Sequence, residues 1–324
     1  SKSVAGGEAS AEGAERPIVV SRFGGFESSR RKRRRLPYQI VDERYVQLLA
    51  LLGPDIDEDV RACMEEVAAD SPSRLKPAVD LSWSALGLGL YDPTFLLELT
   101  ETYYIDRRGG GGSPFWNGIR EHQHRGGAMA RHDYGSFWVL LRMCDHRKWI
   151  PVVNRILNHA AIIQCRSRDG DGRGDRGGQA TVDADSTFTL SIDGTERTYV
   201  GDGGVWGWYR SGTNGPYPCM SALQAVEHWF DNAVASGGQP TKIAEALLDG
   251  CENLAMPALI VGALVRHVDR DPRALDTYLR EPLVWQFESY RAGHEALGFL
   301  RPSDEGIAHP ERRAWSMREV ATLL

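Results

Sequence analysis

The sequence predicts an all-α fold of HEAT-like antiparallel helical repeats (an α-solenoid) with one inserted β-hairpin. Apolar residues recur at three- and four-residue spacing in successive runs of about 12–18 residues, which is typical of amphipathic helices. Turns of about two to five residues, rich in Gly, Pro and Asp, separate these runs, as in stacked helix pairs. One stretch alternates polar and apolar residues instead and predicts the hairpin.

Composition places the chain among soluble globular proteins. It has 324 residues, of which 42% are hydrophobic and 25% charged, and its net charge is −6, which argues against a general nucleic-acid binder. The five cysteines are scattered and odd in number, as expected for reduced thiols in the cytoplasm. The longest apolar run, at 254–265, is too short to span a bilayer. Arginine far outnumbers lysine, which indicates a bacterial, GC-rich source, and no lysine completes a phosphate-binding P-loop.

The amino-terminal part divides into an arm and a set of helices. Residues 1–35 are rich in Gly, Ala and Glu and then strongly basic, which predicts a disordered arm. Residues 36–106 form the N-terminal helical repeats. Their helices are predicted at 38–53, ended by Gly53-Pro54; at 55–70, with acidic residues in the first turn; and at 92–106, with Asp92 as N-cap and Pro93 at the first position.

A flexible linker, 107–113, separates these repeats from a second helical-repeat domain at 114–324. Gly109 to Ser113 spells a linker that protein engineers use, and whether it is engineered or natural stays open. The second domain contains a solvated loop at 166–185 and the hairpin at 186–202, which turns at Asp193-Gly194. Its helices are predicted at 134–144, 148–165, 218–235, 240–251, 253–270 and 272–298. The final stretch, 312–324, resembles half of a helix pair, which predicts a fragment of a longer protein.

A glycine-rich segment at 200–214 carries Trp206, Trp208, Tyr209 and Arg210 just before a helix that contains Glu227. Two interpretations are open. The residues form a partner-binding or substrate pocket, or the tryptophans fill the elbow between the hairpin and the helices. We favour the elbow and expect at least one buried indole, with Glu227 pointing away from both. If the segment is extended, both indoles face one side.

No catalytic or metal-binding motif is complete. Asp202, Glu227 and Asp231 are candidate carboxylates for glycosidic chemistry on an (α/α) toroid, against which we weigh an ordinary polar helix face. His122, His124, His132, Cys144, His146 and His159 are spaced unlike zinc ligands, and we expect exposed loop histidines. The calcium-like run 169–175 has Arg173 at its fifth position and Ala180 at its twelfth, so it fails as an EF-hand. The sequence therefore predicts no catalytic residue, cofactor or metal.

The basic run of the arm is the one candidate for nucleic-acid contact. It consists of Arg30, Arg31, Lys32, Arg33, Arg34 and Arg35. Such a run neutralises phosphates, so its affinity would fall with salt. The alternatives are a solvated arm or a linker to an upstream domain.

Several segments resemble the helical region of large actinobacterial proteins labelled ATP-binding, namely "YDPTFLLELTETYYID", "VVNRILNHAA", "YVGDGGVWGWYRSGTNGPYPCMSALQAVEHWFD" and "LLDGCENLAMPALIVGALVRHV". Those proteins resemble signal-transduction NTPases with repeat arrays, a class tied to phage defence. The resemblance spans 36–300 and implies that the ATPase lies outside this fragment. It carries no catalytic residue across.

The predicted function is a non-catalytic recognition or scaffold module of a larger bacterial protein. Its partner is a protein, another domain of the parent protein, or nucleic acid, with no membrane contact. The alternative is a toroid hydrolase or cyclase with a tryptophan-lined pocket. A toroid closes on itself, whereas a solenoid fragment keeps an open end.

Overall fold

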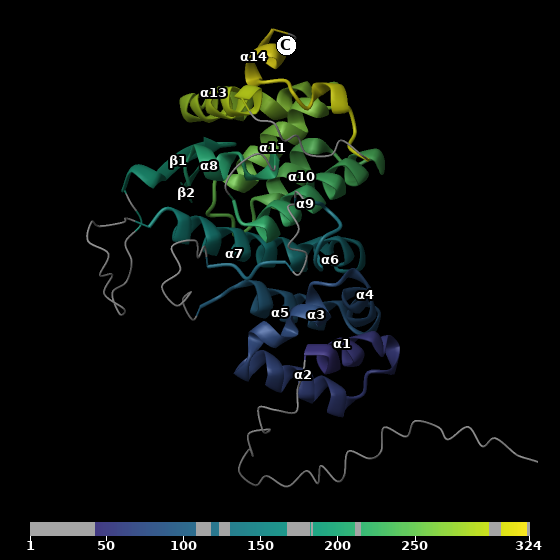
Figure 1. Ribbon diagram of the computed structural model, residues 1–324. Coiled ribbons are helices and arrows are strands. Elements are labelled where there is room, and N and C mark those ends of the chain that lie inside the picture. The colour runs from purple at the N-terminus through teal and green to yellow at the C-terminus, as the bar shows by residue number, and fades with distance from the viewer. Residues whose placement is uncertain are drawn as a thin grey trace, which may run out of the picture. The chain divides into compact units, whose positions relative to one another are not determined.

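A computed structural model describes residues 43–107, 118–122, 130–166, 182, 184–210, 215–297 and 306–322. The chain divides into two units, Ser1–Ile40 and Val41–Leu324, and every described residue belongs to the second. The described residues are mostly helical, with one two-stranded antiparallel sheet (Figure 1). The predicted helical class with one inserted hairpin is therefore confirmed.

Local signals place the first helices. These are α1 (Glu43–Leu51), α2 (Glu58–Asp70), α3 (Lys76–Val79), α4 (Ser82–Tyr91) and α5 (Pro93–Tyr104). The chain leaves α1 through Gly53, whose φ of 57° favours glycine. Asp92 caps α5 as predicted, because its carboxylate accepts from the Thr94 amide at 2.8 Å. The sequence did not predict α4, which carries no charged residue.

The middle of the chain contains α6 (Phe137–Met143), α7 (His146–Gln164), β1 (Thr187–Ile192) and β2 (Thr195–Val200). The predicted hairpin is confirmed, since Asp193 and Gly194 both have positive φ, the geometry of a type I′ turn. Val200 then donates to the Glu252 carbonyl at 2.8 Å and accepts from the Leu254 amide at 3.0 Å. These two bonds fix the hairpin to the connection between two later helices.

The carboxyl-terminal helices are α8 (Gly203–Trp206), α9 (Tyr217–Ala235), α10 (Pro240–Leu247), α11 (Ala255–Arg266), α12 (Asp276–Leu279), α13 (Pro282–Leu297) and α14 (Met317–Ala321). The predicted single helix 272–298 is wrong. It is divided into a 3₁₀ turn at Pro272–Leu275, α12 and α13. Pro282 has no amide hydrogen and excludes the preceding residue from helical geometry, so a new helix begins there.

Helices also pack on helices further along the chain: α4 on α6, α5 on α7, α6 on α9, and α9 on α11 (Figure 1). Two asparagines of α7 join it to the connection after α10. Asn154 donates to the carbonyls of Leu247 and Asp249, at 2.9 and 2.7 Å. Asn158 donates to Gly250 and accepts from the Glu252 amide, both at 2.9 Å. These bonds satisfy backbone groups that a turn between two helices leaves without partners.

The described helices include none whose length and apolarity would carry it across a bilayer.

Candidate functional site

The segment 202–210 forms the predicted elbow. The Asp202 carboxylate caps α8 by accepting from the Val205 amide at 2.8 Å. Both Trp206 and Trp208 are 0% exposed, which confirms the prediction of a buried indole. The segment is helical, as α8 and a 3₁₀ turn at Trp208–Arg210. The expectation that both indoles face the same side assumed an extended segment, and it therefore does not apply.

Each aromatic ring of the elbow has its own packing partner. The Trp206 indole stacks on Phe287 at 5.2 Å and donates to the Glu288 carboxylate at 2.9 Å. A Cβ at Gly215 would lie 2.4 Å from a Trp208 ring carbon, and a Cβ at Gly262 would lie 2.8 Å from Tyr209. Both glycines are therefore required by close ring contacts.

Charged groups join the elbow to α13. Arg210 donates to the Glu295 carboxylate at 2.6 and 3.2 Å. Arg291 donates to Glu295 at 2.7 Å and to Glu288 at 2.8 and 3.0 Å. Burial would raise the pKa of Glu295, but the hydrogen bonds and charges of the two arginines outweigh it and hold the pKa below its ordinary value.

Glu227 takes part in a second buried network, which we call the α9–α11 charge cluster: Glu227, Asp231, Arg266, His267 and Arg313. Glu227 accepts from Arg313 at 2.7 Å and lies 3.3 Å from Arg266. Asp231 accepts from Arg266 and from the His267 ring, each at 2.7 Å. Its members come from α9, from the end of α11 and the residue that follows it, and from the segment just before α14. The cluster therefore attaches the last described segment to the core.

The carboxylates proposed for toroid chemistry thus have structural partners. Asp202 caps a helix, and Glu227 is in ion pairs with two arginines. Burial would raise the pKa of Asp231, but hydrogen bonds from His267 and the charge of Arg266 lower it below its ordinary value. A glycosidic general acid needs the opposite shift.

Trp206, Trp208, Tyr209, Arg210 and Glu227 are all buried, between 0% and 8% exposed. Glu227 pairs with the charge cluster rather than with either indole. Contact of these five residues with a partner would need the elbow to open, and such contact stays a prediction.

A third buried polar group consists of Asp80, Tyr104 and His122, and the sequence did not predict it. His122 was expected in an exposed loop, but it is 3% exposed. Its Nδ1 lies 2.5 Å from the Asp80 carboxylate, which also accepts from the Tyr104 hydroxyl at 2.8 Å. Burial and the charge of Asp80 raise the pKa of Tyr104. A Cβ at Gly135 would lie 2.3 Å from the Tyr104 hydroxyl and 3.0 Å from a His122 ring carbon. The backbone at Gly135 therefore packs directly against Tyr104 and His122.

The other candidate metal ligands are dispersed. The His132 and His228 rings lie 4.0 Å apart, and His146 lies against Trp229 at 5.9 Å. In the part of the chain that the structure describes, no three His, Cys, Asp or Glu side chains form a group that could hold a metal ion. His124 lies outside the described residues.

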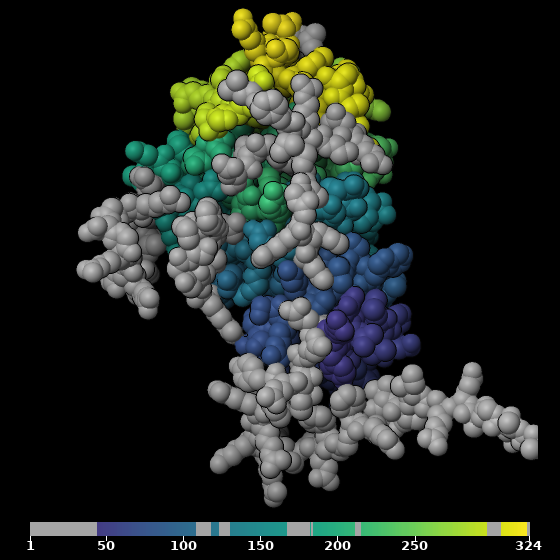
Figure 2. Space-filling view, in the orientation of Figure 1, coloured from purple at the N-terminus to yellow at the C-terminus, as the bar shows by residue number. Residues whose placement is uncertain are grey.

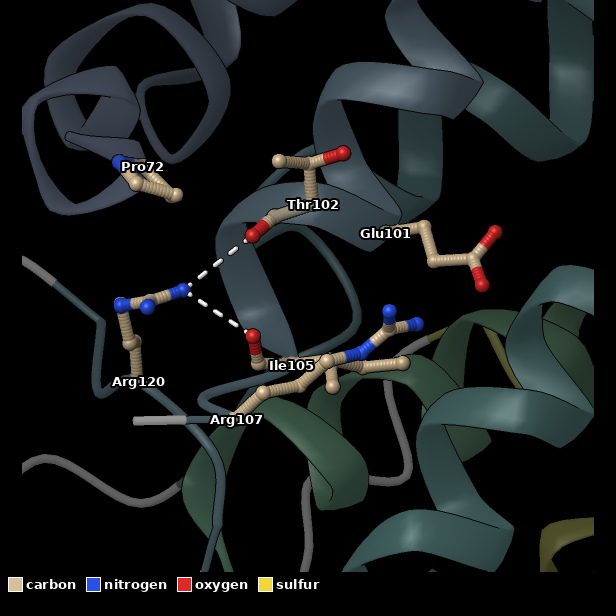
Figure 3. A pocket seen from close by; sticks show the side chains of 6 residues that line it. All are labelled: Pro72, Glu101, Thr102, Ile105, Arg107 and Arg120. Atoms are coloured by element: carbon tan, nitrogen blue, oxygen red, sulfur yellow. Dashed lines mark hydrogen bonds between the residues drawn. The ribbon is translucent and has the colours of Figure 1, made fainter. Parts of the chain in front are cut away.

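A pocket of about 250 Å³ lies at the carboxyl end of α5 (Figure 3). Its lining residues are Pro72, Glu101, Thr102, Ile105, Arg107 and Arg120. The Arg120 guanidinium donates to the carbonyls of Thr102 and Tyr103 in the last turn of α5, to that of Ile105 just after it and, at 2.9 Å, to the Asp106 carboxylate. It therefore caps the negative end of the helix dipole. Four of its lining residues lie within 101–107, while Pro72 and Arg120 come from other parts of the chain, and no sequence motif indicated the pocket.

The clearest exposed feature is apolar. Two leucines of α1, the leucine that follows it and three residues of α4 form what we call the α1–α4 surface: Leu48, Leu51, Leu52, Trp83, Leu86 and Leu90. Trp83 is 78% exposed and Leu48 63%. The helices touch closely, since a Cβ at Gly87 would lie 2.3 Å from a carbonyl of α1 and 3.5 Å from the Leu51 Cα. The side chains of α1, in purple, form part of the face shown in Figure 2.

Several predicted features lie outside the described residues: the basic run Arg30, Arg31, Lys32, Arg33, Arg34 and Arg35, the segment Gly109–Ser113, and the calcium-like run 169–175. No known protein family matches the chain, and no curated protein matches it.

Proposed function

We propose that this chain is a non-catalytic recognition module of HEAT-like helical repeats, part of a larger bacterial protein. Its α1–α4 surface binds the apolar face of an amphipathic helix in a partner protein or in another domain of the parent. Exposure of the six apolar side chains of this surface is the observation that supports the proposal.

The chemistry of the surface specifies the chemistry of the partner. Residues 45–54 and 82–91 contain no Asp, Glu, Lys or Arg, although the exposed face of a helix in water is normally charged. Trp83, Leu86 and Leu90 follow one face of α4 at helical spacing, and Leu51 lies beside that helix at Gly87. An uncharged apolar strip of two helices suits leucines at positions i, i+3, i+4 and i+7 of a third helix. Contiguous apolar exposure of this kind marks interaction sites.

The charged groups of the interior support a non-catalytic role. Glu227, Asp231, Glu288 and Glu295 are each paired with arginine. Carboxylates paired in this way hold helices together and are not available as a general acid. The toroid enzyme is therefore the weaker alternative.

A synthetic peptide tests the proposal. We would measure binding of a fluorescent helical peptide with leucines at i, i+3, i+4 and i+7 and glutamates elsewhere, beside a scrambled peptide of equal composition. The full chain should bind the first peptide alone. Trp83→Ser should weaken binding about thirtyfold, the effect of losing an interface residue worth about 2 kcal/mol. Tyr217→Ser, a change at another exposed aromatic residue, should leave binding unchanged.

Three outcomes would contradict the proposal. Equal binding of both peptides would show that the surface has no helix specificity. If the chain dimerises in sedimentation velocity and Trp83→Ser makes it monomeric, a second copy is the occupant. A salt-sensitive mobility shift with DNA or RNA that is lost on deletion of residues 1–35 would instead favour the nucleic-acid partner.

A further inference from the structure

We infer that the pocket at the carboxyl end of α5 binds the carboxylate of a small organic acid, with Arg107 as its cation. This site is separate from the α1–α4 surface and does not depend on the proposed protein partner. Figure 3 shows Arg120 on one side of the pocket, pointing to the carbonyls of α5, and Arg107 below it, with its guanidinium directed toward Glu101.

The charges of the pocket leave one cation uncompensated. Arg120 is satisfied by carbonyls and by Asp106. Glu101 accepts two hydrogen bonds from Arg155, at 2.6 and 2.8 Å. Among the residues that the structure describes, Arg107 has no hydrogen bond or ion pair, although it lines the pocket. A single uncompensated guanidinium attracts a single negative charge, and its planar fork matches a carboxylate.

The remaining lining residues fit the other parts of such a ligand. The Thr102 hydroxyl has no hydrogen bond to another described residue and can donate to a second carboxylate oxygen. Pro72 and Ile105 offer hydrocarbon for an aliphatic chain. The pocket volume of about 250 Å³ leaves room for a short aliphatic chain beside the carboxylate. The ligand class is therefore a short-chain monocarboxylic acid.

The polarity of the helix end also disfavours anions that carry more than one charge. Carbonyls at the end of α5 disfavour negative charge, and the single charge of Arg120 offsets them. A phosphate dianion would bring more charge than Arg107 compensates. A monocarboxylate balances the site.

Butyrate is a suitable probe, because it has about six heavy atoms, and neutral butyramide has nearly its shape. We would titrate the full chain with each in ligand-observed NMR, with inorganic phosphate as a competitor. Butyrate should bind and butyramide should not. Arg107→Gln should weaken butyrate binding at least tenfold, and Thr102→Val should weaken it severalfold. Arg147→Gln, a change at an exposed arginine of α7, should have no effect.

Thermal unfolding of each variant would confirm that it folds, which is expected because Arg107 is exposed. Three results would each overturn the inference: no butyrate binding up to about 10 mM, equal affinity of Arg107→Gln and Arg147→Gln, or displacement of butyrate by a lower concentration of phosphate. The last result would assign the site to phosphate instead. Loss of peptide binding by Trp83→Ser would leave the butyrate titration unchanged, so the two proposals fail separately.

Discussion

Replacing Trp206 with alanine removes the indole that joins the elbow to α13. The side chain is fully buried, and an indole covers up to about 250 Å². At about 25 cal/mol per Å² this corresponds to about 6 kcal/mol, an upper bound because the unfolded chain already covers part of its surface. The lost hydrogen bond adds little, since Glu288 keeps two bonds from Arg291. We expect the free energy of unfolding to fall by about 3–5 kcal/mol, as for other buried aromatic residues.

Urea unfolding followed by circular dichroism measures this change. Trp83→Ala is the matched control, because Trp83 is 78% exposed and its truncation should change the free energy of unfolding by less than about 0.5 kcal/mol. Trp206→Phe should fall between the two, which keeps the comparison informative if the alanine variant does not fold. A loss below about 1 kcal/mol for Trp206→Ala would refute the elbow packing and favour an open tryptophan pocket.

Two further predictions concern pH and backbone contact. Burial and the neighbouring His132 lower the pKa of His228 to about 4, so the unfolded chain takes up a proton between about pH 6.5 and 4 that the folded chain does not. His228 should therefore contribute a fall of about 3 kcal/mol in the free energy of unfolding across that window. His228→Asn, but not His146→Asn, should remove this contribution and make the fall smaller, and an unchanged pH profile would disprove the assignment. Gly87→Ala should destabilise by about 1–3 kcal/mol because its Cβ would lie 2.3 Å from a carbonyl of α1, whereas Gly293→Ala, which meets nothing within 4 Å in α13, should stabilise by about 0.5–1 kcal/mol; similar unfolding midpoints for the two variants would contradict the close helix contact.

The sequence predicted those elements whose boundaries depend on neighbouring residues. Asp92-Pro93 starts α5, Gly53 ends α1, and Asp193-Gly194 turns the hairpin, because each acts on backbone groups within a few residues. The predicted helix 272–298 was wrong, because its apolar spacing continues across Pro282 although this residue has no amide hydrogen and begins a new helix. α4 was not predicted, since its uniform apolarity gives it no contrast between faces.

The candidate site was less predictable than the fold. Crowding of Trp206 and Trp208 indicated a packed elbow, but the hydrogen-bond partner of Trp206 lies 82 residues later. Likewise, Asp80 and His122 are separated by 42 residues, and neither has a neighbour in sequence that indicates the pair. Such contacts are set by tertiary packing, which a single sequence does not encode in any local pattern.

The buried charged groups and the exposed apolar groups of this protein differ in whether the folded chain gives them partners. Burying a charge is costly unless it is paired, and the carboxylates of the charge cluster, Glu227 and Asp231, both have arginine partners. Removing one partner would leave a buried charge, so these residues hold particular segments in place. The exposed apolar residues Trp83 and Leu48 have no such compensation in the folded chain. Contact of these side chains with water costs free energy that contact with another apolar surface would remove, and we propose the α1–α4 surface as the recognition surface for that reason.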